Sequence, residues 1–241
     1  MPFLSKISAD TTNVDKRRYP FSIPSIRNGL DISLSSDVTF FVGENGSGKS
    51  TIIEAIASHI GFNLSGGSKN HLFSDETASD LVDILRLSWN PVRITNGFFM
   101  RAESFFNFAS YVDSLAEDEP GLLDAYGGKS LHKQSHGESF LSLFNNRFSK
   151  GIYILDEPEA ALSPARQLAF LAIINRLVKE GNAQFLIATH SPILMSYPGA
   201  ITLSINESGV SPIDYRDTEH FNLTMGFLSN PEGYLRHLFD E

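Results

Sequence analysis

Short apolar runs recur along the chain and are bounded by glycine or polar residues. Each run is too short for a helix and is rich in β-branched or aromatic side chains, so we expect buried strands. Four such runs are found, at residues 38–42, 152–155, 184–188 and 200–205. Unbroken apolar character, rather than alternation, is typical of strands that are covered on both faces of a parallel sheet.

Helical patterns lie between these runs. The isoleucines at 52, 53, 56 and 60 share one helical stripe that ends at Gly61. A second helix is expected from Ser163-Pro164 to Gly181, because serine caps a helix and proline suits its first turn. Residues 79–89 are also interpreted as a helix. Strands that alternate with helices predict an α/β fold with a mostly parallel sheet.

Composition restricts the function classes. The 241 residues are 41% hydrophobic, which suffices for one substantial core. The net charge of −9 disfavours long-range attraction of nucleic acid, although a local basic patch stays open. The chain has no cysteine, no apolar leader and no run near the roughly 20 apolar residues that cross a bilayer. We therefore expect a cytoplasmic protein without a membrane span.

A glycine-rich loop follows the first strand and opens the first helix. It matches the pattern G-x-x-x-x-G-K-[ST], in which main-chain N–H groups and a helix N-terminus surround phosphate. We expect it to bind ATP through Lys49, which would reach the β- and γ-phosphates, and through Ser50, which would ligate Mg²⁺. The loop and its first helical residues are Gly43, Glu44, Asn45, Gly46, Ser47, Gly48, Lys49, Ser50 and Thr51.

Two acids and a histidine end the next strands. Asp156 and Glu157 follow the run at 152–155, and His190 follows the run at 184–188. Parallel strands place such residues at one edge of the sheet, where ligands bind. Asp156 is predicted to orient Mg²⁺, directly or through water, and Glu157 to act as general base. His190 is predicted to sense or stabilise the γ-phosphate.

The order of these residues resembles the ABC-type ATPase superfamily. Gln134-Ser135-His136-Gly137-Glu138 looks like its signature, with the serine and second glycine kept and His136 and Glu138 departing from the pattern. The resemblance implies that Ser135, His136, Gly137 and Glu138 serve the ATP of a partner protomer. Leu155-Asp156-Glu157-Pro158-Glu159-Ala160 is more similar to soluble recombination and chromosome-maintenance ATPases (SMC/RecF-like heads) than to transporter subunits.

Two further positions are expected from the resemblance. The family glutamine has no convincing counterpart, and Arg101-Ala102-Glu103 stands in its place. Glu103 is a candidate metal or water contact, and Arg101 a candidate phosphate or partner contact. The alternative is an Arg-Glu pair at a helix start. Tyr19 stands where transporter-type members stack an aromatic ring on adenine. Arg17, Arg18 and Phe21 compete for that role, and simple packing of Tyr19 is the alternative.

The fold that the resemblance implies is a P-loop NTPase with an antiparallel N-terminal β portion and a small helical lobe. We expect one domain over residues 1–241, with the lobe at roughly 70–145. The expected activity is Mg-dependent ATP hydrolysis that drives homodimerisation around the nucleotide, acting on nucleic acid or a partner protein. A transporter nucleotide-binding subunit, or an ATP sensor with little turnover, is the alternative.

Overall fold

The main sheet has six strands. A computed structural model describes residues 1–64, 79–91, 94, 96–102, 105–118, 121, 123–124, 128–130, 132, 136–148 and 150–239. In spatial order the strands are β5 (Gly97–Arg101), β6 (Gly151–Asp156), β7 (Ala183–Ala188), β3 (Val38–Val42), β8 (Ile201–Asn206) and β9 (Gly209–Ile213). Every neighbouring pair is parallel except β8 and β9, which form an antiparallel hairpin. The four predicted strands and the mostly parallel sheet are confirmed.

A second, antiparallel sheet lies beside the first. Its order is β2 (Leu30–Ser33), β1 (Leu4–Ala9) and β4 (Leu85–Trp89), so the antiparallel N-terminal β portion is also confirmed. The predicted helix at 79–89 is wrong. Only α3 (Leu81–Ile84) is helical there, and β4 follows it directly. Pairing with β1 overrides the local helical pattern, because Leu85 is buried against the distant N-terminal strand.

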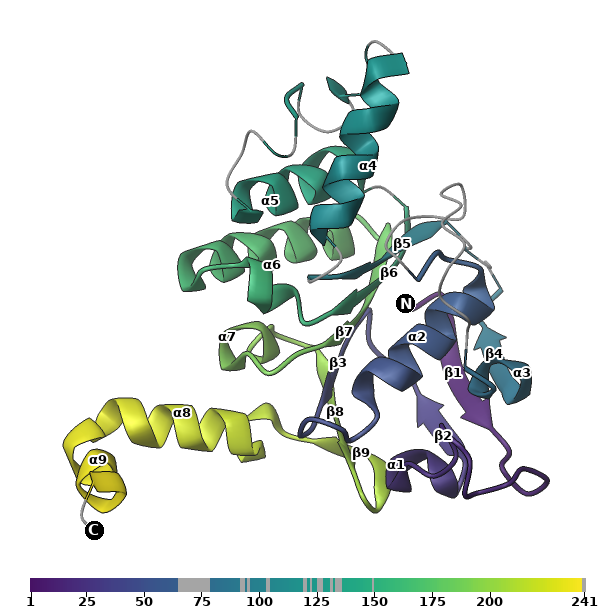
Figure 1. The fold of residues 1–241 in the computed structure, drawn as a ribbon, viewed down its shortest axis with the longest axis vertical. Coiled ribbons are helices and arrows are strands. Elements are labelled where there is room, and N and C mark those ends of the chain that lie inside the picture. The colour runs from purple at the N-terminus through teal and green to yellow at the C-terminus, as the bar shows by residue number, and fades with distance from the viewer. Residues whose placement is uncertain are drawn as a thin grey trace.

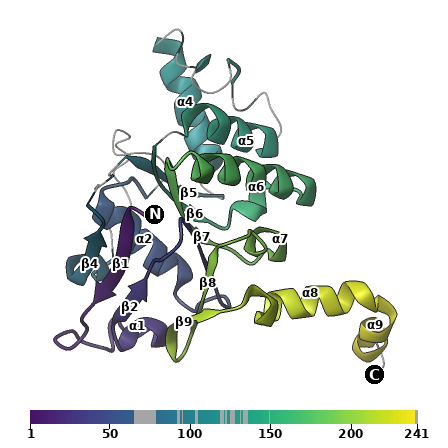
Figure 2. The ribbon, with the colours of Figure 1, turned by 180° about the vertical axis from the view of Figure 1, so that it is seen from behind.

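Helices cover both faces of the main sheet (Figures 1 and 2). Helix α2 (Lys49–Ile60) packs on the face toward the antiparallel sheet, in a core that includes Phe41 and Leu186. The opposite face, which includes Phe40 and Phe185, is covered by α4 (Phe105–Asp118), α5 (His136–Arg147), α6 (Pro164–Lys179) and α7 (Pro192–Met195). Alternate residues of one strand therefore feed two separate cores.

Phenylalanine rings join α4 and α5 to the sheet. Phe105 and Phe140 lie with ring centroids 5.5 Å apart, and Phe140 and Phe144 stack at 4.8 Å. Phe148 stacks on Tyr153 of β6 at 3.9 Å. Phe98, Phe99, Phe105 and Phe108 are all buried, so these rings pack in the core and are not available to stack on a base.

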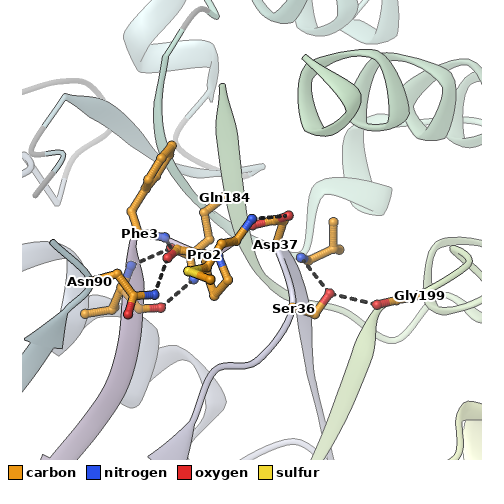
Figure 3. A network of polar contacts seen from close by, with 10 residues as sticks. Pro2, Phe3, Ser36, Asp37, Asn90, Gln184 and Gly199 are labelled. Atoms are coloured by element: carbon orange, nitrogen blue, oxygen red, sulfur yellow. Dashed lines mark hydrogen bonds and ion pairs between the residues drawn. The ribbon is translucent and has the colours of Figure 1, made fainter. Parts of the chain in front are cut away.

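One buried side chain connects the two sheets. Gln184 of β7 accepts hydrogen bonds from the main-chain N–H groups of Phe3 and Leu4 at 2.9 and 2.8 Å, and donates to the Leu4 carbonyl at 2.8 Å (Figure 3). Gln184 is fully buried. The start of β1 is thus hydrogen-bonded to a side-chain amide on the internal strand β7, and not to the backbone of the main sheet.

The C-terminal segment leaves the body. After the 3₁₀ turn η4 (Tyr215–Asp217), α8 (Glu219–Ser229) projects outward and α9 (Pro231–Phe239) packs across its far end (Figures 1 and 2). Neither helix has a buried residue, and Leu228 and Phe239 are 68% and 74% exposed. We call α8 and α9 the C-terminal arm. In the part of the chain that is described, no helix has the length and apolar character needed to cross a membrane.

Candidate functional site

The glycine loop takes a shape that side chains would prevent. It leaves β3 at Gly43 and enters α2 through Gly48, whose φ is 102°. A Cβ atom on Gly43 would lie 2.3 Å from the Ile205 carbonyl oxygen, and one on Gly48 would lie 2.9 Å from the Ser25 hydroxyl. Ser25, in the short helix α1 (Pro24–Arg27), donates a hydrogen bond of 2.5 Å to the Ser47 carbonyl. The loop is therefore held close against Ile205 and Ser25, and it opens at the start of α2.

The Lys49 side chain folds back onto the loop. Its ammonium donates to the carbonyls of Gly43 and Glu44 at 2.7 and 2.9 Å, and the residue is 4% exposed. Burial lowers the pKa of Lys49, and the carboxylates of Glu157, Asp156 and Glu159 oppose that shift. The amine is therefore a desolvated cation that faces three acids across a small space.

Asp156 lies opposite Ser50. The Ser50 hydroxyl donates to Oδ1 of Asp156 at 3.3 Å, which brings the start of α2 to the end of β6. Arg101, aligned with Asp156 in the β5–β6 ladder, has its Nε 3.6 Å from Oδ2 of Asp156 and also pairs with Glu54. Burial is the largest influence on Asp156 and raises its pKa, against the hydrogen bond from Ser50 and the charge of Arg101.

These groups fit magnesium held with a nucleotide. A cavity of about 220 Å³ is lined by Ser50, Arg101, Ala102, Asp156, Glu157 and Ala160. A hydroxyl and a carboxylate are the hard oxygen donors that Mg²⁺ takes, with phosphate and water completing its shell. Among the described residues no cluster of three or more acids, histidines or cysteines forms a protein-only metal cage. The site suits an ion that arrives with phosphate.

Glu157 is held in an unusual backbone conformation. Its φ of 50° makes it the one described non-glycine residue with a positive φ. Its N–H donates to the Ala188 carbonyl of β7 at 2.9 Å, and the 3₁₀ turn η3 (Pro158–Ala161) follows at once. Such strain is typical of functional positions, because the surrounding structure must impose it. In this conformation the Glu157 side chain lies beside His190.

His190 meets Glu157 at the same edge of the sheet, as its strand-end position predicts. Nε2 of His190 lies 3.3 Å from Oε1 of Glu157. The main-chain N–H of His190 donates to Oε1 of Glu159 at 2.6 Å, and Nδ1 lies 2.6 Å from Nε2 of His220. Burial lowers the pKa of His190, and the nearby cation Lys49 acts in the same direction.

Sequence reasoning missed two of these neighbours as site residues. Glu159 lies within the motif after Asp156, and its burial, which raises its pKa, is the feature that sets it apart. His220 comes from α8, in no recognisable motif, and only the fold brings it to His190.

The remaining predicted site residues lie apart from this group or outside the described chain. Glu103 and Ser135, with Gln134, are not among the described residues. His136 begins α5, and a Cβ on Gly137 would lie 2.5 Å from Cδ of Arg166 and 3.1 Å from the Ala161 carbonyl oxygen. Glu138 forms an ion pair of 3.2 Å with Arg166.

Tyr19 lies beside the start of α2. Its hydroxyl is 3.1 Å from Oγ1 of Thr51, and the residue is 61% exposed. The ring is therefore not packed into the core.

Comparison with known proteins agrees with this geometry. A family profile described as "AAA domain" matches residues 21–94, and one described as "AAA domain, putative AbiEii toxin, Type IV TA system" matches residues 139–196. No curated protein sequence matches the chain.

Solved structures of ATP-binding cassettes share this architecture with TM-scores above 0.5, and an SMC head aligns at a lower score. The cbiO1 protein of Clostridium perfringens, part of the cbiONQ ABC transporter complex, aligns with a TM-score of 0.51 and 17% identity over 99% of this chain and 100% of that chain. An ATP-binding cassette of an ABC transporter in its ADP conformation aligns at 0.51 and 16%, over 92% and 99%. An SMC head domain from Thermotoga maritima aligns at 0.49 and 18%, over 89% and 99%.

Proposed function

From the premise that this chain has the fold of the ABC-type P-loop ATPases, we propose that it binds Mg·ATP and hydrolyses it. One observation carries the proposal: the phosphate-loop helix and two strand ends converge on a single space. Ser50 lies 3.3 Å from Asp156, and Glu157 lies 3.3 Å from His190. Each pair joins segments that are far apart in the sequence, and each residue has the chemistry that phosphoryl transfer to water requires.

Binding uses the loop and the start of α2. The main-chain N–H groups from Gly43 to Thr51 surround the phosphates, and the α2 N-terminus favours their negative charge. Lys49 exchanges its bonds to the Gly43 and Glu44 carbonyls for phosphate oxygens. Ser50 and Asp156 would hold Mg²⁺, which would supply positive charge beside the phosphates when bound. Tyr19 is the proposed contact for the adenosine, and Glu103 a proposed further oxygen ligand.

Hydrolysis uses Glu157 and His190. Glu157 accepts a proton from the attacking water while the water oxygen bonds to the γ-phosphorus. The bond between the γ-phosphorus and the β–γ bridging oxygen then breaks. ADP and inorganic phosphate result. His190 presents Nε2 on the same side and stabilises the charge on the γ-phosphate oxygens. Lys49 contributes a second positive charge.

We further propose that two copies of one ABC-type ATPase domain, residues 1–241, close around two nucleotides. Gly137 and Glu138 stand in the first turn of α5, where they pack against Arg166 of α6 in the helical half of the molecule. That half includes α4 and α5, within the lobe proposed at roughly 70–145. Together with Ser135 and His136, they are the proposed contacts to the γ-phosphate of the partner protomer. Closure of this kind acts on nucleic acid or on a partner protein.

Replacing the proposed base tests the activity. We expect Glu157→Gln to lower steady-state phosphate release at least about 100-fold, because a general base contributes roughly that much or more. Mg·ATP binding, measured by calorimetry, should persist. Glu180→Gln, at an exposed carboxylate at the end of α6, is the matched control and should hydrolyse ATP at the wild-type rate. Equal rates for wild type and Glu157→Gln would refute the assignment of the base.

A further inference from the structure

His220 is an imidazole in direct contact with the one proposed to face the γ-phosphate. Its Nε2 lies 2.6 Å from Nδ1 of His190, and the ring centroids are 4.7 Å apart. We propose that His220 is a positioning residue: it donates its Nε2–H to Nδ1 of His190 and so fixes the tautomer that presents Nε2–H to the nucleotide. The proposal rests on the proposed ATPase function for its kinetic consequence, but not for the tautomer itself.

The neighbours of His190 determine which nitrogen carries the proton. Nε2 lies 3.3 Å from the Glu157 carboxylate, and the phosphate that would bind there also has only acceptor oxygens. Nε2 can make a favourable contact with either group only if it carries hydrogen. A neutral imidazole then has a lone pair on Nδ1, which needs a donor.

His220 is the donor that the geometry supplies. A contact of 2.6 Å between two ring nitrogens requires one hydrogen and one lone pair, because two lone pairs or two N–H groups would repel each other. With the lone pair on Nδ1 of His190, the hydrogen belongs to Nε2 of His220. A carboxylate or carbonyl partner would accept from Nδ1–H and select the other tautomer, whereas His220, as a donor, selects the tautomer with hydrogen on Nε2.

The backbone of His220 is fixed independently of this contact. Thr218 is 3% exposed and caps α8, accepting from the Phe221 N–H at 3.3 Å while its hydroxyl donates to the Tyr215 carbonyl at 2.6 Å. The rings of Tyr215 and Phe221 meet edge to face at 5.4 Å. The first turn of α8 is therefore anchored, so His220 reaches His190 from a rigid position.

His220 also borders the phosphate loop. A cavity of about 490 Å³ has Gly43, Asn45 and Gly46 on one side and Thr218, Glu219 and His220 on another. The contact thus lies inside the nucleotide-binding region rather than on a remote surface. Glu159 fixes the backbone of His190 by accepting from its main-chain N–H, and His220 contacts Nδ1 of the ring, which leaves Nε2 available 3.3 Å from Glu157.

Three variants test the role. His220→Phe keeps a ring of similar size but removes the donor, and His220→Gln restores an amide N–H. His237→Phe, at an exposed histidine of α9, is the matched control. We expect His220→Phe to lower kcat for ATP about tenfold with KM unchanged, since one orienting hydrogen bond is lost. His220→Gln should recover most of kcat, and His237→Phe should match wild type.

Nitrogen-15 NMR of labelled histidine gives a readout that does not need turnover. The His190 signals, assigned by their loss in His190→Gln, should show Nε2–H in the wild type and a mixture of tautomers in His220→Phe. A wild-type Nδ1–H tautomer would overturn the proposal, as would an unchanged tautomer in His220→Phe, even with a slower kcat. If the wild type hydrolyses no ATP, the proposed function fails and the NMR result alone decides the role of His220.

Discussion

Asp156, Glu159, Lys49 and His190 all experience burial as their largest electrostatic influence. Burial disfavours charge, so it raises the pKa of the two acids and lowers the pKa of the two bases. Each side chain is thus shifted toward its neutral form while no ligand is bound. Phosphate would favour the charged form of Lys49 and magnesium the charged form of Asp156, so we infer that binding strengthens these two ionised groups, whereas His190 keeps the neutral form that accepts from His220.

Glu159 offers a test of this burial through stability. Its folded-state pKa is raised above 4.5, so its contribution to stability is present below pH 4.5 and is lost as the pH rises through the folded value. We expect Glu159→Gln to match wild type in acid and to exceed its free energy of unfolding by about 1 kcal/mol near neutral pH, because a buried charge is removed. The amide oxygen can still accept from the His190 N–H.

Urea unfolding of both proteins between about pH 4 and pH 8 measures the difference. Glu180→Gln should show no pH-dependent difference from wild type, since that carboxylate is exposed. Parallel wild-type and Glu159→Gln curves over the whole range would contradict the raised pKa.

At the scale of single residues, the sequence predicts those site residues that lie at strand ends or in motifs. Asp156, Glu157 and His190 follow apolar runs, and parallel strands bring such residues together, as the structure confirms. His220 was out of reach because its contact depends on how α8 leaves the β8–β9 hairpin, which no local pattern encodes. Glu159 lies in a motif that the sequence shows, but its burial beside the His190 backbone depends on the fold.

At the scale of elements, non-local pairing decides what the sequence leaves ambiguous. Residues 38–42 and 49–60 behave as predicted, since burial on both faces and a helical stripe are strong local signals. Residues 85–89 form a strand only because β1, some 80 residues earlier, supplies a ladder. The same dependence on the N-terminus appears at Gln184, whose three hydrogen bonds reach Phe3 and Leu4.

Gln184→Met should weaken the attachment of β1. Methionine has a similar volume but leaves two N–H groups and one carbonyl without a partner, at a cost of about 2–3 kcal/mol in unfolding free energy. Amide exchange at Leu4 should accelerate more than exchange in β3. Asn146→Ala is the control, because the bonds of that exposed amide to described residues stay within its own helix, and it should cost at most about 0.5 kcal/mol. An unchanged Gln184→Met would show that the bridge contributes nothing.

At the scale of the whole molecule, the proposed nucleotide sandwich, in which two copies of the chain close around two nucleotides, can be tested through its oligomeric state. With Mg·ATP, Glu157→Gln should shift from monomer to dimer in light scattering, because bound ATP is not hydrolysed when the general base is missing. Adding Ser135→Glu should restore the monomer, since a carboxylate would face the partner's γ-phosphate and be repelled. Glu157→Gln with ADP serves as the control. A monomer at saturating ATP would contradict the sandwich.

The overall architecture was predictable because order and spacing of motifs accompany this fold, and the antiparallel sheet and mostly parallel sheet agree with it. The C-terminal arm was not. Its residues carry apolar side chains on helices that bury none of them, so hydrophobic pattern alone gives no direction for packing.

The C-terminal arm extends from the capped first turn of α8, which contains His220. Helix α8 has 11 residues, so a small tilt at its first turn is magnified over a length of roughly 16 Å. If nucleotide binding shifts this anchored turn as a unit, α9 moves with it. Linkage makes the converse obligatory: a molecule that holds α9 in one orientation changes the affinity for nucleotide by the same factor as nucleotide changes its own.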